Sequence, residues 1–502
     1  MTTQLEQRKP RSYGNWSRPK SAGLLGLGQF GTIVLLASMI VAVILTIAVD
    51  LLWGFGFMTG VSFLLLLSAV RDKHGQSVLA RITTRIGWMR TRSKRHHLYR
   101  SGPLGRTDWG TTQLPGLAAS SRLSEWHDSY HRPFALIHFP SSAHYTVVIV
   151  TDPDGSSLVD MEQIDVWVSE WGMWLANIGG EPGLEAASVT VETAPDTGLR
   201  LRRQVQEQMQ ENASEFSRRL LHSLVDAYPS GSAVVRAYIA LTFSAAARAG
   251  GRKRSAEEMG RELAARIPGL TQSLGATGAG AARPLSAQEL CEVIRIAYDP
   301  AAAILIDEAN AAGEPPEIPW TEVGPAAHQA GWETYRHDSA LSVSWMMSTA
   351  PRGHVPSSVL TRLLAPHRDI ARKRVTLLYR PIDPGRAAAI VDTDTRAANF
   401  LLTASDRPTA HNLATARAAQ ATAEEEASGA GMLNFGILVT ATVTDLSREA
   451  DARAALDNLS ATARLRLRPV YGSQDTAFAA ALPLGLVLHK HLQMPATIRE
   501  QL

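Results

Sequence analysis

The sequence predicts an N-terminal transmembrane α-hairpin followed by a cytoplasmic α+β part, in which two ferredoxin-like modules of order ββαβαβ are joined by a helical connector. Three observations lead to this prediction: a long apolar run, basic flanks on both sides of it, and alternating strand and helix patterns beyond it. We expect a basic cytoplasmic arm at 1–23, the hairpin at 24–70, a basic juxtamembrane connector at 71–113, the first α+β module at 114–250, the helical Ala/Gly/Pro-rich connector at 251–320, and the second α+β module at 321–502.

The apolar run at 24–70 is the basis for the hairpin. A membrane span needs about 20 apolar residues, so the run is long enough for two. Asp50 is its only charge, and a carboxylate at mid-bilayer would cost roughly 2.5–3.5 kcal/mol. We therefore place the hairpin turn at Asp50. A cleaved signal peptide is the alternative, but its apolar core would be only about 7–15 residues long.

Basic residues on both flanks predict the orientation. By the positive-inside rule, both termini and the main body are expected in the cytoplasm, with the two spans in the cell membrane. The same side chains are expected to bind anionic lipid headgroups. The net charge is only +3, which argues against a surface that binds nucleic acid. The flanking basic residues are Arg8, Lys9, Arg11, Arg18 and Lys20 before the run, and Arg71, Lys73, Arg81, Arg85, Arg90, Arg92, Lys94, Arg95 and Arg100 after it.

The remaining elements follow from hydrophobic periodicity and turn residues. Residues 78–89 have a weak amphipathic helical period and are expected to lie along the membrane surface. In the first module we expect strands at 134–139, 144–151, 187–193 and 233–243, with helices at 160–178 and 199–224. Connector helices are expected near 255–267 and 286–308. In the second module we expect strands at 340–348, 374–379, 433–443 and 463–470, with helices at 357–364, 386–427 and 447–459.

Trp167, Trp171 and Trp174 recur at the spacing of a single helix face. We interpret this face as packing on the sheet, with a partner-docking stripe as the alternative.

No catalytic, cofactor-binding or metal-binding residues are predicted. The glycine-rich stretch 275–280 lacks the lysine of a phosphate-binding loop and is interpreted as a linker. Four histidines at 127, 131, 138 and 144 have no cysteine or suitably spaced acid beside them, so we read them as structural. Cys291 is the only cysteine, which excludes an intramolecular disulfide. An alternative of a different class is a membrane-bound enzyme with a site built from scattered residues such as His138, His144 and Asp165.

Several stretches resemble parts of secretion machines. The order of basic arm, two-span hairpin and connector in 1–100 is similar to the PrgI-type membrane subunits of conjugation-like type IV systems. The part after residue 114 resembles the N-terminal non-ATPase domain of the large conjugation ATPase, through His144-Tyr-Thr-Val-Val-Ile-Val-Thr, Ser188-Val-Thr-Val-Glu-Thr-Ala-Pro-Asp and the closing Leu467-Arg-Pro-Val-Tyr-Gly-Ser-Gln-Asp-Thr-Ala-Phe-Ala-Ala-Ala-Leu-Pro-Leu-Gly485. In that ATPase family the closing element precedes the motor domain, so the motor is expected on another polypeptide.

The resemblance implies an actinobacterial structural subunit, without enzymatic activity, that tethers a separate motor ATPase to membrane channel subunits. The residues expected to dock the partner are Tyr471, Gly472, Phe478, Leu482 and Pro483. A homo-oligomer is a further expectation. The competing resemblance is to EccE, a membrane component of type VII secretion, which also has two N-terminal spans and a cytoplasmic α+β domain; Asp165-Val-Trp-Val-Ser-Glu-Trp-Gly-Met-Trp-Leu is similar to it in style.

Overall fold

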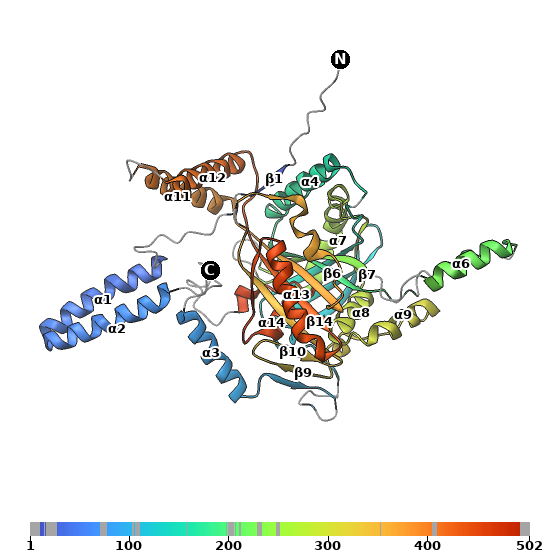
Figure 1. Cartoon of the computed structure of the whole chain (residues 1–502), viewed down its shortest axis with the longest axis horizontal. Helices are drawn as coiled ribbons and strands as arrows, with labels where there is room; N and C mark the ends of the chain where they lie inside the picture. Colours follow the sequence, from blue (N-terminus) through green and yellow to red (C-terminus); the bar gives the residue numbers. More distant parts are fainter. Residues whose placement is uncertain are drawn as a thin grey trace, which may run out of the picture.

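The protein is built around one large antiparallel sheet, as seen in the computed structural model (Figure 1). The structure describes residues 11–14, 16, 28–70, 78–102, 105, 111–156, 158–196, 198, 205, 207–209, 212–227, 233–246, 252–351, 353–403 and 409–491. Within this part, a 13-stranded sheet has the order β2-β9-β10-β11-β14-β13-β6-β7-β5-β4-β3, with β15 paired to β11 and β8 paired to β5.

The strands are β2 (Leu98–Arg100), β3 (Arg122–His127), β4 (Pro133–Phe139), β5 (His144–Thr151), β6 (Leu184–Pro195), β7 (Ala233–Ser244), β8 (Ala282–Pro284), β9 (Ala327–Ala330), β10 (Tyr335–His337), β11 (Ala340–Thr349), β13 (Arg372–Pro381), β14 (Leu433–Val443) and β15 (Arg466–Pro469). A separate two-stranded pair joins β1 (Ser12–Tyr13) to β12 (Val355–Pro356).

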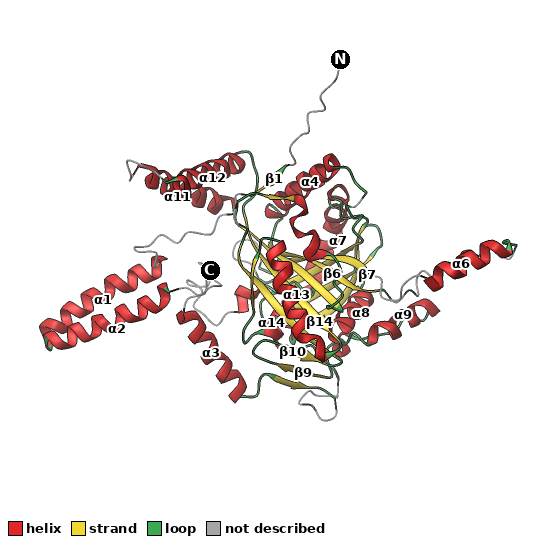
Figure 2. Cartoon of the chain, in the orientation of Figure 1, coloured by secondary structure: helices red, strands yellow, loops and turns green. Residues whose placement is uncertain are grey.

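The helices surround this sheet or project from it (Figure 2). They are α1 (Gly28–Ala48), α2 (Leu51–Ala69), α3 (Val78–Ser93), α4 (Met161–Gly179), α6 (Glu215–Ala227), α7 (Ala256–Gln272), α8 (Ala287–Tyr298), α9 (Ala302–Ala312), α10 (Thr361–Leu364), α11 (Pro384–Thr403), α12 (Ala410–Ala427), α13 (Glu449–Thr462) and α14 (Gln474–Ala480). The α1–α2 hairpin, α6 and the α11–α12 hairpin extend away from the sheet (Figure 1).

The prediction of two small ferredoxin-like modules is wrong. Strand β6, expected in the first module, pairs with β13 of the second from Ala187↔Tyr379 to Thr193↔Lys373. Each strand would otherwise present an edge of unpaired backbone groups, and pairing satisfies both edges at once. The two sets of strands therefore form one continuous sheet.

The predicted transmembrane hairpin is also wrong. The apolar run does form two helices, with α2 beginning directly after Asp50, whose Oδ1 accepts a hydrogen bond from the Leu51 amide at 2.6 Å. The run is thereby divided into helices of 21 and 19 residues. Among the described residues, none of the helices combines the length and apolar character required to cross a bilayer. The expected two-span location in the cell membrane is corrected on the same ground.

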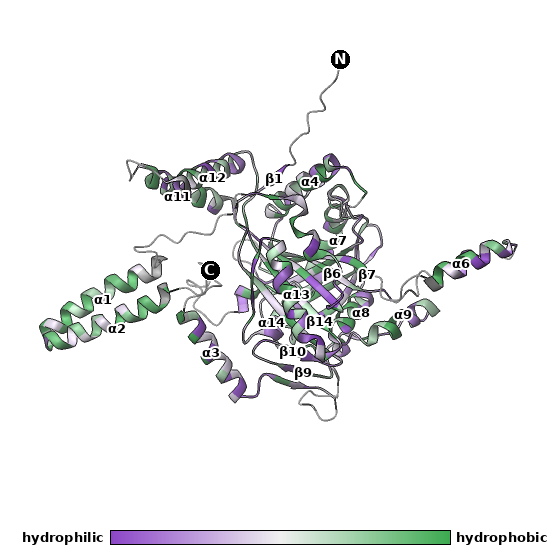
Figure 3. Ribbon diagram, in the orientation of Figure 1, coloured by the Kyte–Doolittle hydropathy of each residue, from purple (hydrophilic) through white to green (hydrophobic). Residues whose placement is uncertain are grey.

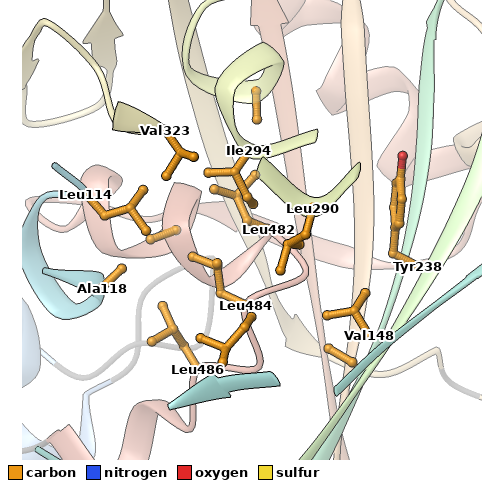
Figure 4. Close-up of a cluster of buried hydrophobic side chains, with 14 of the residues drawn as sticks. Leu114, Ala118, Val148, Tyr238, Leu290, Ile294, Val323, Leu482, Leu484 and Leu486 are labelled. Atoms are coloured by element: carbon orange, nitrogen blue, oxygen red, sulfur yellow. The ribbon is translucent and has the colours of Figure 1, made fainter. Parts of the chain in front are cut away.

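Both faces of the sheet are covered, which explains why the central strands are apolar almost throughout. On β4, Phe134 and Leu136 belong to one buried cluster, whereas Ala135 and Ile137 belong to another on the opposite face. Helices α4 and α7 contribute to the first cluster, and α8 and the chain after β15 to the second. Figure 4 shows this second cluster, in which side chains as far apart in the sequence as Leu114 and Leu486 meet. A third cluster packs α13 against β11, β13 and β14.

Candidate partner-binding site

The segment 467–485, which we expected to face a motor ATPase, begins in strand β15 of the sheet and then lies across one face of it. Its backbone is held by threonine hydroxyls: Thr376 Oγ1 donates to Ala481 O at 3.1 Å, and Thr242 Oγ1 donates to Gly485 O at 2.9 Å. Gly485 has a φ of 68°, and a Cβ there would lie 2.3 Å from Thr242 Oγ1. Glycine is thus required where this segment crosses the hydroxyl groups.

The structure buries most of the residues predicted to dock a partner. Phe478 is 0% exposed and Leu482 is 1% exposed, and Pro483 is also buried. Tyr471 and Gly472 keep part of their surface. Of the five predicted residues, a partner that binds the native surface could therefore contact only Tyr471 and Gly472 directly.

Tyr471 and Gly472 lie in an aromatic patch that holds α3 against the body. Tyr471 stacks on Trp332 with 5.4 Å between ring centroids, and Trp332 lies 6.2 Å from Trp88 of α3. The Arg85 guanidinium sits 5.6 Å from the Trp332 ring. The predicted amphipathic helix at 78–89 is confirmed as a helix, and its arginines' binding to anionic lipid stays a prediction.

A groove of about 1400 Å³ opens in the described part of the chain. Its walls come from the end of α4, the start of β6, the end of β11, helices α11 and α12, and the turn before β14. Leu465, just before the segment 467–485, and His489 and Lys490, just after it, also line the groove. The groove therefore lies beside both flanks of that segment.

The groove has an apolar floor and a rim of mixed charge. Leu377, Tyr379 and Phe435 lie on neighbouring strands β13 and β14 and are half-buried or buried. Charged side chains of both signs surround them: Glu181, Glu185, Arg380, Asp383, Arg386, Asp394, Glu425 and Lys490. Burial lowers the pKa of His489 to about 4, so this side chain is neutral at pH 7. Such a surface suits a polypeptide segment with apolar anchors and polar flanks.

A buried charge cluster, which the sequence analysis missed, joins β6 to β13. Glu192 accepts from Arg372 Nη1 at 2.5 Å and from Arg374 Nη2 at 3.1 Å. The two guanidinium groups outweigh the desolvation of the carboxylate and lower the pKa of Glu192 to about 2. A cavity of about 100 Å³ beside the cluster is also lined by Arg236 and Tyr238. The signal in the sequence was the charged run Arg372-Lys-Arg374, of which only Arg374 fell inside the strand predicted at 374–379; the observed β13 begins at Arg372.

The structure does not assemble the alternative enzyme site. In the β4–β5 pair, His138 lies opposite Tyr145 and stacks on it at 4.3 Å, whereas His144 lies opposite Phe139. Because successive side chains of a strand point to opposite faces, the two histidines lie on different faces of the sheet. Asp165 is on α4, where it accepts a 3.0 Å hydrogen bond from the Tyr13 hydroxyl. Within the described residues, no three His, Cys, Asp or Glu side chains are arranged to hold a metal ion.

The tryptophans of α4 face the body, as the interpretation of a packing face predicted. Trp174 is 2% exposed and stacks on Trp171 with 4.8 Å between centroids. Trp167 packs over Gly278, where a Cβ would lie 2.5 Å from the indole ring. The glycine-rich stretch 275–280 thus provides the space for this ring.

Comparison with known proteins gives little beyond the N-terminal hairpin. A family model described as a domain of unknown function (DUF8461) matches residues 20–80, which include α1 and α2. No curated protein matches the chain.

Proposed function

We propose that the protein is a structural subunit, without enzymatic activity, of a bacterial secretion or conjugation apparatus, and that its groove binds a separate motor ATPase. The observation that supports this most directly is the position of the groove. It is lined by Leu465, His489 and Lys490, which flank the segment that resembles the end of the non-ATPase domain of the conjugation ATPase. In that family the motor follows this point on the same chain, so a separate motor is expected to dock nearby.

The size and chemistry of the groove also favour a polypeptide. About 1400 Å³ exceeds the roughly 300–1,000 Å³ of pockets for small molecules and cofactors. The apolar floor offers anchor sites for such a segment.

A capture experiment with a matched pair of variants tests the proposal. The full chain is used as bait for a purified motor ATPase of the conjugation type. Ile390→Glu places a charge on the α11 wall of the groove, and Leu413→Glu places one on α12 at a position that does not line it. We expect the first variant to lose at least tenfold in affinity, because a buried unpaired charge at an interface costs several kcal/mol. The second should bind as the wild type does. Equal capture by all three chains would contradict the proposal.

A further inference from the structure

The α1–α2 hairpin is made almost wholly of hydrophobic residues (Figure 3), and many of its large apolar side chains are exposed. On α2 alone, eight large apolar side chains are 37–78% exposed: Leu51, Leu52, Trp53, Phe55, Phe57, Phe63, Leu64 and Leu66. At about 150–200 Å² per full side chain, they leave roughly 800 Å² of apolar surface. The largest apolar patch of a typical monomer is only about 300–600 Å².

Three glycines divide α2 into a closed face and an open face. A Cβ on Gly54 would lie 2.0 Å from Thr46 Oγ1 and 2.9 Å from Ala42 O, so this face is in close contact with α1. A Cβ on Gly56 or Gly60 would meet nothing within 4 Å. At about 100° per residue, Gly56 and Gly60 lie about 40° apart, and Gly54 is about 160° from Gly56. The Gly54 face of α2 therefore packs against α1, whereas the face of Gly56 and Gly60 has no neighbouring helix in the described part of the chain.

The open face has the shape of a seat for another helix. Gly56 and Gly60 form its floor, and the same angular spacing places Trp53 and Phe63 on either side as walls. These two side chains are 69% and 61% exposed. Small residues four apart let two helix backbones approach closely, and the larger neighbours then interlock.

We propose that this face binds the same face of a second copy of the chain. Asp50 is the only charged residue between 28 and 70, so a matching surface must be almost wholly apolar, and the chain itself supplies one. A twofold axis would set Gly56 and Gly60 of one copy against those of the other. Of the eight exposed side chains, Leu52, Trp53, Phe57, Phe63 and Leu64 lie within about 80° of the seat and leave roughly 500 Å² on each copy. Two copies would thus bury about 1,000 Å², which reaches the lower bound for a specific interface.

The test measures the oligomeric state of the full chain by sedimentation equilibrium in aqueous buffer. We expect a dimer for the wild type and at least a tenfold weaker dimer for Gly56→Leu, because the side chain fills the seat. Gly87→Leu is the matched control: Gly87 is also open on an exposed helix, and its substitution should leave the dimer unchanged. A monomeric wild type, a polydisperse aggregate, or equal association of all three chains would overturn the proposal.

Cross-linking tests the same contact at a single position. The natural Cys291 is 2% exposed, so a cysteine introduced at position 56 is the reactive one. Gly56→Cys should form a disulfide between copies under mild oxidation, and Gly87→Cys should not. Flotation of the chain with phospholipid vesicles, without a cross-link at position 56, would assign the face to lipid and overturn the proposal.

Discussion

Removing the Phe478 ring should destabilise the whole body, because this side chain is fully buried where the two sets of strands meet. Its ring lies 5.0 Å from Tyr335 and 4.6 Å from His337 by centroid, and the Arg374 guanidinium is 5.5 Å away. Truncation of a buried phenylalanine to alanine costs about 3–5 kcal/mol, from lost transfer free energy and from the cavity left behind. We expect Phe478→Ala to lower the free energy of unfolding by that amount.

The assay is urea denaturation followed by tryptophan fluorescence. At a slope of about 3 kcal/mol per molar urea, the predicted loss lowers the unfolding midpoint by about 1–2 M. Phe400→Ala is the matched control, since Phe400 on α11 is 69% exposed and its loss should change stability by no more than about 0.5 kcal/mol. A Phe478→Ala midpoint within the error of the Phe400→Ala midpoint would refute the assignment of segment 467–485 to the core.

Two further predictions concern buried titratable groups. Burial lowers the pKa of His337 from its ordinary 6.5 to about 4, so the unfolded chain takes up a proton that the folded chain refuses. This histidine's stabilisation is complete above pH 6.5, and about 3 kcal/mol of it is lost as the pH falls to 4; His337→Gln should flatten that part of a measured stability profile. Glu192→Gln leaves two buried guanidinium groups without their carboxylate and should cost about 3–5 kcal/mol in urea denaturation. The exposed Glu257→Gln, whose partner Arg261 is equally exposed, should change little, and equal effects of both substitutions would argue against the buried cluster.

Local patterns in the sequence placed many strands well. The run of β-branched and aromatic residues at 144–151 and the run at 433–443 coincide with β5 and β14. These predictions succeed because a strand buried on both faces must be apolar along its length. The break at Asp50 was also found, although the predicted cause was the cost of a carboxylate inside a bilayer; in the structure Asp50 is the N-cap residue of α2. One helix was expected at 386–427, and the structure has α11 and α12 there instead.

The errors concern contacts between distant parts of the chain. The pairing of β6 with β13 joins residues 180 or more positions apart. A local sequence pattern does not determine which two edge strands pair with each other. The same limit explains why Phe478 and Leu482 were predicted to dock a partner although they are buried in the core. Their spacing is that of any amphipathic helix, so the sequence could not tell an apolar face that meets the sheet from one that meets a partner. The groove was missed because its lining comes from many separate stretches of chain between Gly14 and Lys490.

The central claim is tested most directly by site-specific photo-cross-linking in the source bacterium. A photoreactive side chain is placed at Ile390, inside the groove, and in a second strain at Leu413, outside it. The account predicts that position 390 cross-links to a motor ATPase and that position 413 does not. Cross-links to an ATPase from position 413 alone, or from neither position in cells that contain the ATPase, would contradict it.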